Sequence, residues 1–165
     1  MTEFFKIIEV AIWSGIAALG FGILFNIPKK AIFTVFFLGF MAGLIKFVLL
    51  HLNINIIVAS FAGALSVGFL SMPLAHKIHQ PPVVFSIPAV IPMIPGYFAY
   101  KTVLAVMNFT FIETESAKRV ELIDHIFSNG FTMFFILISL TIGVSFPLLM
   151  LRKTTVKNMA RKLED

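Results

Sequence analysis

The sequence contains no cysteine and has few charged residues. Without a thiol, disulfides, thiolate metal sites and catalytic cysteines are all excluded within its 165 residues. Only 13% of the residues are charged and 59% are hydrophobic, twenty of them phenylalanine. An ordinary soluble domain is about 25% charged, and a soluble protein of this size has too much surface for its volume to bury so much apolar area. We therefore expect lipid to be the solvent for most of the chain.

Catalytic motifs are absent from the long apolar runs, and the acidic residue that falls within one of them, Glu9, lies near the outer end of the first. The eight acidic residues lie near the ends of the chain or in the polar stretch 112–129, so we expect no carboxylate relay inside the membrane. Neither the zinc-protease pattern H-E-x-x-H nor the hydrolase pattern G-x-S-x-G occurs. His76 and His79 lie three residues apart but lack a third ligand. The sequence therefore predicts no enzyme, no metal site and no cofactor, and its basic residues show no nucleic-acid-binding pattern.

Five apolar stretches are long enough to form transmembrane helices, each of which needs about 20 mostly apolar residues. We expect these spans at about 7–25, 31–50, 54–74, 83–111 and 130–151. The first ten residues carry Glu3 and Glu9 and only one lysine, Lys6, which is a poor start for a signal peptide, so we interpret the first stretch as a retained transmembrane helix. The fold class is accordingly all-α, with one polytopic transmembrane domain over residues 1–165. The polar stretch 112–129 is expected to form a short interfacial helix, and residues 152–165 a basic cytoplasmic tail.

The distribution of lysine and arginine predicts the orientation of the five spans. Positive residues gather in cytoplasmic loops, and five crossings place eight of them on one face and three on the other. The larger group is Lys29, Lys30, Lys77, Arg152, Lys153, Lys157, Arg161 and Lys162, and the smaller is Lys6, Lys118 and Arg119. The N-terminus is therefore expected outside and the C-terminus in the cytoplasm. If residues 83–111 instead form a re-entrant loop, the split becomes six against five, so we favour five crossings.

The fourth predicted span carries the segment FSIPAVIPMIPGYFAYK, residues 85–101. A proline inside a helix removes a backbone donor and costs about 3 kcal/mol. Backbone interrupted in this way is tolerated in a bilayer only against protein or a wet cavity. Three prolines, Pro88, Pro92 and Pro95, together with Gly96 therefore predict a broken helix, with a second half-helix that begins near Tyr97.

This break predicts a site for a carboxylate or another anion. The free N–H groups at the start of the second half-helix carry a partial positive charge, and Lys101 lies about one turn further on. Discontinuous helices of this kind form substrate sites near the middle of the membrane in many transporters. The alternative is a kinked helix without a ligand. Lys46, near the outer end of the second span, is expected to extend its ammonium to the membrane surface, and Asn26 to cap a helix start or form a plain turn.

Small residues recur at helical spacing in three of the spans. They are Gly39 and Gly43, then Ser60, Ala64 and Gly68, and finally Ser139 and Gly143. Rows of small residues let helices approach closely in lipid. We therefore expect tight helix partners, some of which can belong to another chain.

Two stretches resemble the threonine/serine exporter family. They are GFGILFNIPKKAI, residues 20–32, and PPVVFSIPAVIPMIPGYFAY, residues 81–100. The resemblance covers essentially the whole chain and is to the small split-type subunit, which corresponds to the C-terminal membrane half of the single-chain exporters. The matched positions are Asn26, Pro28, Pro92, Pro95, Gly96 and Tyr100, whereas Lys101 is inferred from the helix geometry alone.

The resemblance implies export of small polar metabolites across the bacterial cytoplasmic membrane, either threonine and serine or a dicarboxylate such as succinate. It also implies a larger companion membrane subunit, which agrees with the odd number of spans and with the absence of carboxylates from them. The candidate substrate residues are Asn26, Pro92, Pro95, Gly96, Tyr97, Tyr100 and Lys101. The alternative is a scaffold or assembly subunit in which the proline segment only packs. A second copy of the chain is a further candidate partner.

Overall fold

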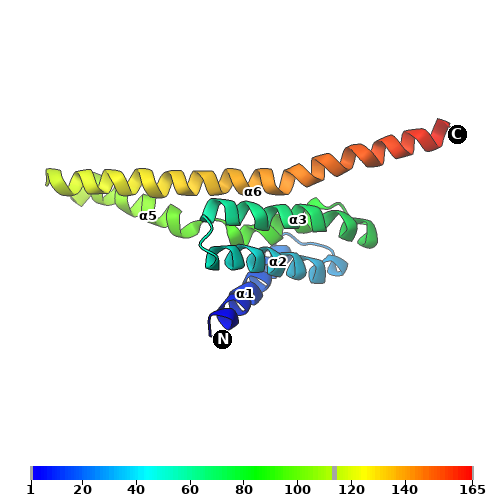
Figure 1. Ribbon diagram of the computed structural model, residues 1–165, viewed down its shortest axis with the longest axis horizontal. Helices are drawn as coiled ribbons and strands as arrows, with labels where there is room; N and C mark the ends of the chain where they lie inside the picture. The colour runs from blue at the N-terminus through cyan, green and yellow to red at the C-terminus, as the bar shows by residue number, and fades with distance from the viewer. Residues whose placement is uncertain (1, 113–114, 165) are drawn as a thin grey trace. The chain divides into compact units, whose positions relative to one another are not determined.

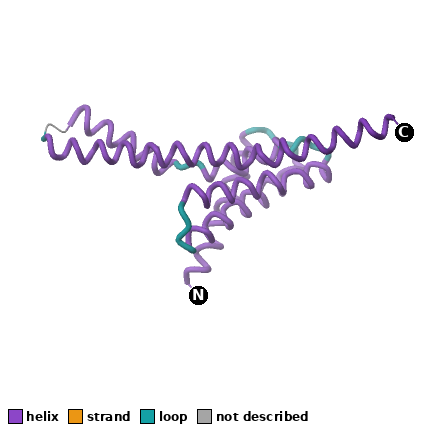
Figure 2. Tube along the Cα trace, turned by 45° about the horizontal axis from the view of Figure 1, so that its top comes forward, coloured by secondary structure: helices purple, strands orange, loops and turns teal. Residues whose placement is uncertain are grey.

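The computed structural model describes residues 2–112 and 115–164, with side chains for 4–112 and 115–150. Every regular element in these ranges is a helix, which confirms the all-α fold class (Figure 2). The elements are α1 (Thr2–Leu24), η1 (Lys29–Ala31), α2 (Ile32–His51), α3 (Ile56–Ile78), α4 (Val83–Val90), η2 (Ile91–Met93), α5 (Gly96–Met107), η3 (Asn108–Ile112) and α6 (Ser116–Glu164). Glu113 and the side chains of Glu3 and of the tail 152–165 lie outside the described residues.

Four helices are long and apolar enough to cross a membrane, and a broken one adds a fifth (Figure 1). The four are Phe4–Leu24, Lys29–His51, Ile56–Ile78 and Ser116–Met150. The fifth is the bent pair Val83–Met93 and Gly96–Ile112, counted as one span. Neither member of the pair has the about 20 residues that a crossing needs. The chain is therefore a polytopic membrane protein with about five transmembrane helices, the fourth of them broken at the predicted Pro–Gly element.

The polar stretch 112–129 does not form the separate interfacial helix that we expected. Residues 116–129 are instead the first turns of α6, which continues without interruption to Glu164. These turns are rich in strong helix formers, and the first proline of α6 is Pro147. From Ser116 to Met150 the helix has 35 residues. It is therefore about 52 Å long, whereas the hydrocarbon core of a bilayer is about 30 Å thick. The charged first turns consequently extend beyond the hydrocarbon.

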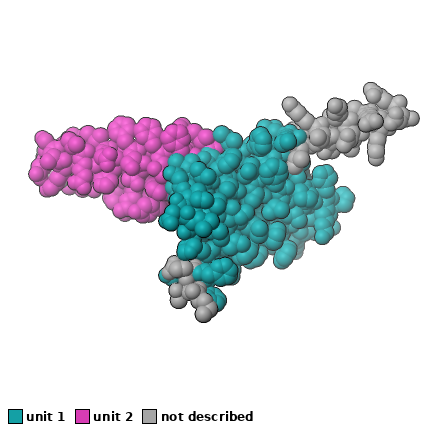
Figure 3. All heavy atoms as spheres, in the orientation of Figure 1, with its two compact units in different colours: residues 1–93, 139–165 teal, residues 94–138 magenta. Residues whose placement is uncertain are grey.

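The chain forms two compact units, which Figure 3 distinguishes by colour. Unit 1 consists of residues 1–93 and 139–165, and unit 2 of residues 94–138. Unit 2 contains α5, η3 and the first turns of α6. A Cβ added at Gly130 of α6 would lie 3.6 Å from the methyl carbon of Thr102 on α5, which is ordinary contact. The contact between these two helices therefore has room for a Cβ at position 130 and does not depend on glycine there.

In unit 1, glycines on α2 allow close contact with α1. A Cβ added at Gly43 would lie 2.7 Å from the Cβ of Ser14, and one added at Gly39 would collide with the Cβ of Ala18. The hydroxyl of Ser14 donates a hydrogen bond of 3.0 Å to the Gly39 carbonyl. The row of small residues on the second span thus marks a contact within this chain.

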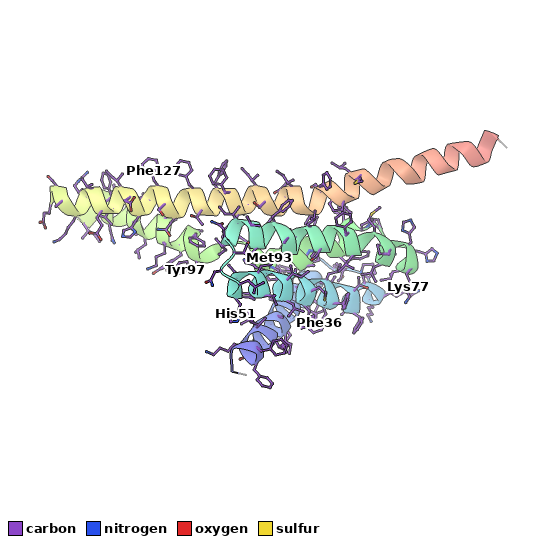
Figure 4. All side chains as sticks on the ribbon, in the orientation of Figure 1. Phe36, His51, Lys77, Met93, Tyr97 and Phe127 are labelled. Atoms are coloured by element: carbon purple, nitrogen blue, oxygen red, sulfur yellow. The ribbon has the colours of Figure 1, made fainter. Side chains whose placement is uncertain are left out.

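A glycine on α3 forms a second close contact in unit 1, with α2 and with the end of η2. A Cβ added at Gly63 would lie 2.9 Å from the Ala42 carbonyl oxygen and 2.6 Å from Cε of Met93, which is labelled in Figure 4. The short turn between α2 and α3 makes these two helices antiparallel, and Asn55 caps α3 by accepting a hydrogen bond of 2.8 Å from the Ile57 N–H. The last residue before the break is therefore held between two transmembrane helices.

Candidate functional site

The fourth span breaks at residues 94–95. The 3₁₀ turn η2 ends at Met93, and α5 begins at Gly96. Between them Pro95 has φ −79° and ψ 60°, and the Gly96 N–H donates a hydrogen bond of 2.8 Å to the Ile94 carbonyl. These values are those of an inverse γ-turn, in which the backbone is not helical. The predicted break is therefore confirmed.

Two prolines produce this break by removing backbone donors. Pro92 has no N–H for the carbonyl of Pro88, and Pro95 has none for the carbonyl of Ile91. The last carbonyls before the break also lose their helical partners, because the helix does not continue. The Met93 carbonyl instead accepts a hydrogen bond of 3.3 Å from Nζ of Lys46 on α2.

Lys46 does not extend to the membrane surface as we expected. Its side chain is only partly exposed, and its ammonium contacts the backbone at the break. The physical reason is that a carbonyl freed inside unit 1 is within reach of the side chain. Lys46 and Met93 are 47 residues apart in the chain, and hydropathy does not indicate which helices become neighbours. No sequence signal available from one chain identifies this contact.

A polar pocket of about 320 Å³ lies in unit 2, between α5 and the first turns of α6. Its polar side chains are Tyr97, Lys101 and Asn108 from α5 and η3, and His125 and Asn129 from α6. The spacing of these residues places each set on one face of its helix. The Lys101 ammonium lies 5.7 Å from the centre of the Tyr97 ring, within the range of a cation–π contact. The pocket therefore offers a cation, an aromatic face and two amides to a small polar ligand.

The structure brings some of the predicted site residues together and separates others. Tyr97 and Lys101 share the pocket of unit 2, whereas Tyr100 is exposed and does not line it. Sequence reasoning missed Asn108, together with His125 and Asn129 of the same pocket. The position of Asn108 two turns beyond Lys101, on the same helix face, is the signal that would have found it. Because the last span was expected to begin only at residue 130, the sequence places His125 and Asn129 in the separate interfacial helix expected over residues 112–129.

Asn26 does not lie at the broken helix. Its backbone is left-handed, with φ 53°, and its N–H donates a hydrogen bond of 2.9 Å to the Ile23 carbonyl, so it ends α1. The turn η1 that follows is preceded by Pro28 and has no side-chain cap. Together with the hydrogen bond of 3.1 Å from the Ile27 N–H to the Gly22 carbonyl, this geometry is a Schellman motif, so Asn26 caps the C-terminal end of α1 and not a helix start. It precedes α2 at the end opposite to Lys46, which lies near the C-terminus of that helix.

A larger hollow of about 890 Å³ lies in unit 1, between the C-terminus of α3, the start of α4 and α6. Its walls are almost entirely apolar and include Met72, Val83, Leu148 and Leu149. It contains none of the predicted site residues. A polar metabolite gains little in such a hollow, so it is not the candidate site.

Replacing Gly96 by alanine is expected to leave the protein folded and to stabilise α5 slightly. A Cβ at this position would have no atom within 4 Å, and the φ of Gly96 is not positive. Alanine favours a helix over glycine by up to about 1 kcal/mol. Thermal unfolding of the purified variant in detergent is the measurement. A clear fall in Tm would show that the glycine acts as the hinge that the Pro–Gly pair predicts.

Comparison with known proteins places these features in a family. The family model described as threonine/serine exporter, ThrE, matches residues 10–150. An uncharacterized protein of Haemophilus influenzae (strain Rd) is 31% identical over 142 residues, which are 86% of this chain and 46% of that protein. The chain thus spans about half the length of this curated relative. No solved structure matches the chain significantly. Because the family model covers all five spans and the break, the chain belongs to the threonine/serine exporter family.

Proposed function

We propose that the chain is the membrane subunit of a secondary exporter of small metabolites that carry a carboxylate. Membership of the threonine/serine exporter family is the observation that carries this proposal. The broken fourth span supports it, because interrupted helices place free backbone groups where a transporter binds its substrate. The proposed substrates are threonine and serine, or a dicarboxylate such as succinate. The proposed location is the bacterial cytoplasmic membrane.

A larger companion membrane subunit is proposed to complete the transporter. The chain covers only 46% of the relative that it matches. A companion subunit would correspond to the rest of that protein. The carboxylates of the transmembrane helices lie near their ends, Glu9 in α1 and Glu121 and Asp124 in α6, and none lies in the middle of an apolar stretch, where proton-coupled carriers commonly use them. A companion that carries such groups would provide both missing parts.

The pocket of unit 2 is proposed to receive the carboxylate. Lys101 supplies the positive charge and the side-chain amide of Asn108 a neutral donor, whereas the Asn129 amide already donates one hydrogen bond of 2.8 Å to the His125 carbonyl and has one N–H left. Hydrogen bonds between a charged donor and a carboxylate are about twice as strong as neutral ones. A hollow of about 320 Å³ also suits a small cargo, since ligand pockets begin at about 300 Å³.

Export itself is tested by deleting the gene in the native host and loading the cells with labelled L-threonine, L-serine or succinate. Efflux of at least one of the three is expected to slow in the deletion strain and to recover when the chain is restored. Equal efflux of all three with and without the chain would contradict the proposed function.

Replacing Lys101 by glutamine is expected to slow export by about tenfold, because a charged hydrogen bond contributes about 1.5–3 kcal/mol. Efflux of the transported metabolite from cells with equal amounts of the variant in the membrane is the measurement. Lys101→Arg keeps the charge and is expected to retain most of the activity. If Lys101→Gln exports at the normal rate, the pocket is not a substrate site. The alternative of a scaffold subunit predicts that result.

The orientation is tested with single cysteines, since the chain has none of its own. We expect a cysteine at Ser116 to react with a membrane-impermeant thiol reagent added to intact cells, and a cysteine at Thr155 to react only after the membrane is opened. Five crossings place the first position outside and the second inside. Protection of position 116 together with labelling of position 155 would contradict the predicted orientation.

A further inference from the structure

Lys46 is a basic side chain inside unit 1 that has no carboxylate partner among the described residues. Among the side chains described in unit 1, Glu9 on α1 is the acidic one, and it is exposed and forms no ion pair with Lys46. The described polar contact of Lys46 is its hydrogen bond to the Met93 carbonyl. Ionised side chains within transmembrane helices are costly and usually pair or line a substrate pathway. The charge of Lys46 therefore requires an explanation.

The hydrogen bond to Met93 does not neutralise this charge. Its length is 3.3 Å, whereas a charged N–H donor lies about 2.7–2.9 Å from a carboxylate oxygen. The carbonyl is neutral, and an ammonium has three donors, so at least two remain for another acceptor. A carboxylate would form shorter and stronger bonds to Lys46 than Met93 does.

A buried hydroxyl lies at the same level of the helix bundle as Lys46. Ser60 on α3 is fully buried, and its Oγ has no hydrogen-bond partner among the described residues. Ala42 faces Gly63 across the antiparallel pair of α2 and α3. Lys46 follows Ala42 by four residues and Ser60 precedes Gly63 by three, so both lie about one turn from this contact in the same direction. The Lys46 ammonium and the Ser60 hydroxyl, which has no hydrogen-bond partner among the described residues, thus lie at a similar level along the helix axes, near the break.

We propose that Lys46 binds the carboxylate of the exported metabolite at the broken helix, in exchange for its hydrogen bond to Met93. This inference rests on the proposed function and adds a second cation to it. Lys101 belongs to the pocket of unit 2, whereas Lys46 belongs to unit 1. A carrier has to bind and then release its cargo, and two separate cations give the carboxylate two positions. When the cargo binds Lys46, the Met93 carbonyl loses its hydrogen bond, so cargo binding changes the hydrogen bonding of the backbone at the break.

The test compares a carboxylate cargo with its amide in everted membrane vesicles from the native host. Whichever of L-threonine, L-serine or succinate is transported serves as cargo, and its amide serves as a neutral inhibitor. Lys46→Gln keeps a donor for Met93 but removes the charge. We expect it to raise the half-saturating concentration of the cargo by about tenfold and to change the half-inhibitory concentration of the amide by less than about twofold.

Glu9→Gln is the matched control, because it removes the acidic side chain described in unit 1 and is expected to change neither concentration. If Glu9→Gln reproduces the effect of Lys46→Gln, the two residues pair with each other and the proposal is wrong. The proposal is also wrong if Lys46→Gln lowers only the maximal rate, which is the result expected from loss of an ion pair with a companion subunit. It is wrong as well if the half-saturating concentration of the cargo and the half-inhibitory concentration of the amide change by the same factor.

If Lys46→Gln does not accumulate in the membrane, Lys46→Arg decides the question. A guanidinium binds a carboxylate in a forked geometry, so the half-saturating concentration of the cargo is expected to shift by about threefold or more, with the amide unaffected. An unchanged value for the cargo would overturn the proposal. Vesicles from the deletion strain report separately on the proposed function, which fails if they transport all three metabolites as well as wild-type vesicles do.

Discussion

Replacing Gly39 by valine is expected to separate α1 from α2 and to lower the stability of the protein severely. A Cβ at this position collides with the Cβ of Ala18 and lies 3.2 Å from the backbone oxygen of Ser14. The Cβ of Ala18 and the backbone oxygen of Ser14 cannot move aside as the end of a flexible side chain can, because both are fixed by the backbone of a packed helix. Overpacking of this kind costs about 1–3 kcal/mol, and the two γ-methyl groups of valine add to the clash. The contact would therefore open rather than adjust.

Opening the contact also removes a hydrogen bond. The Ser14 hydroxyl donates to the carbonyl of Gly39 itself, and bonds between transmembrane helices contribute about 0.6 kcal/mol on average. We expect a total loss of about 3 kcal/mol, which for a chain of this size lowers Tm by about 6–12 °C. Thermal unfolding in detergent and the steady-state amount in the membrane are the measurements.

Gly20→Val is the matched control for this prediction. Gly20 is also a glycine in a transmembrane helix, but a Cβ there would have no atom within 4 Å. Valine at position 20 is therefore expected to leave Tm unchanged or slightly raised. Similar losses for both variants would mean that valine itself disturbs insertion, and the α1–α2 contact would not be the cause.

The spans and the break follow from local properties that one sequence displays. Hydropathy identifies the transmembrane stretches because each must be apolar over the thickness of the same bilayer. Pro92 and Pro95 mark the break because a proline lacks a backbone N–H whatever residues surround it. Gly96 shows the limit of this reasoning. The sequence predicts a Pro–Gly hinge, but the turn is made by Pro95, whose ψ is 60°, while Gly96 needs no positive φ.

The candidate site depends on which helices become neighbours, and that is not a local property. Lys46 meets Met93 because α2 and α4 pack together, and Lys101 shares a pocket with Asn129 because α6 starts as early as Ser116. Periodicity assigns a residue to a face of its own helix only. A lysine at the end of an apolar stretch looks the same whether its ammonium reaches water or a carbonyl on another helix.

Replacing Pro92 and Pro95 together by alanine is expected to close the break and to abolish export while making the protein more stable. The two new N–H groups can bond the carbonyls of Pro88 and Ile91, and each proline inside a helix costs about 3 kcal/mol relative to alanine. In a continuous helix the Met93 carbonyl would accept from the N–H four residues later, so Lys46 would lose its acceptor. The free amides at the start of α5 would be consumed as well.

Efflux of the transported metabolite and thermal unfolding, measured on the same variant, separate this prediction from simple damage. We expect efflux to fall by at least about tenfold while Tm rises, a combination that misfolding does not produce. Pro73→Ala is the control, because Pro73 lies exposed inside α3 and away from the break, so that only Tm should rise. A double variant that is more stable and still exports normally would show that the proline element serves packing alone. A transporter needs its backbone groups free at the point of binding, and the stability given up at these two prolines is the expected cost of keeping them so.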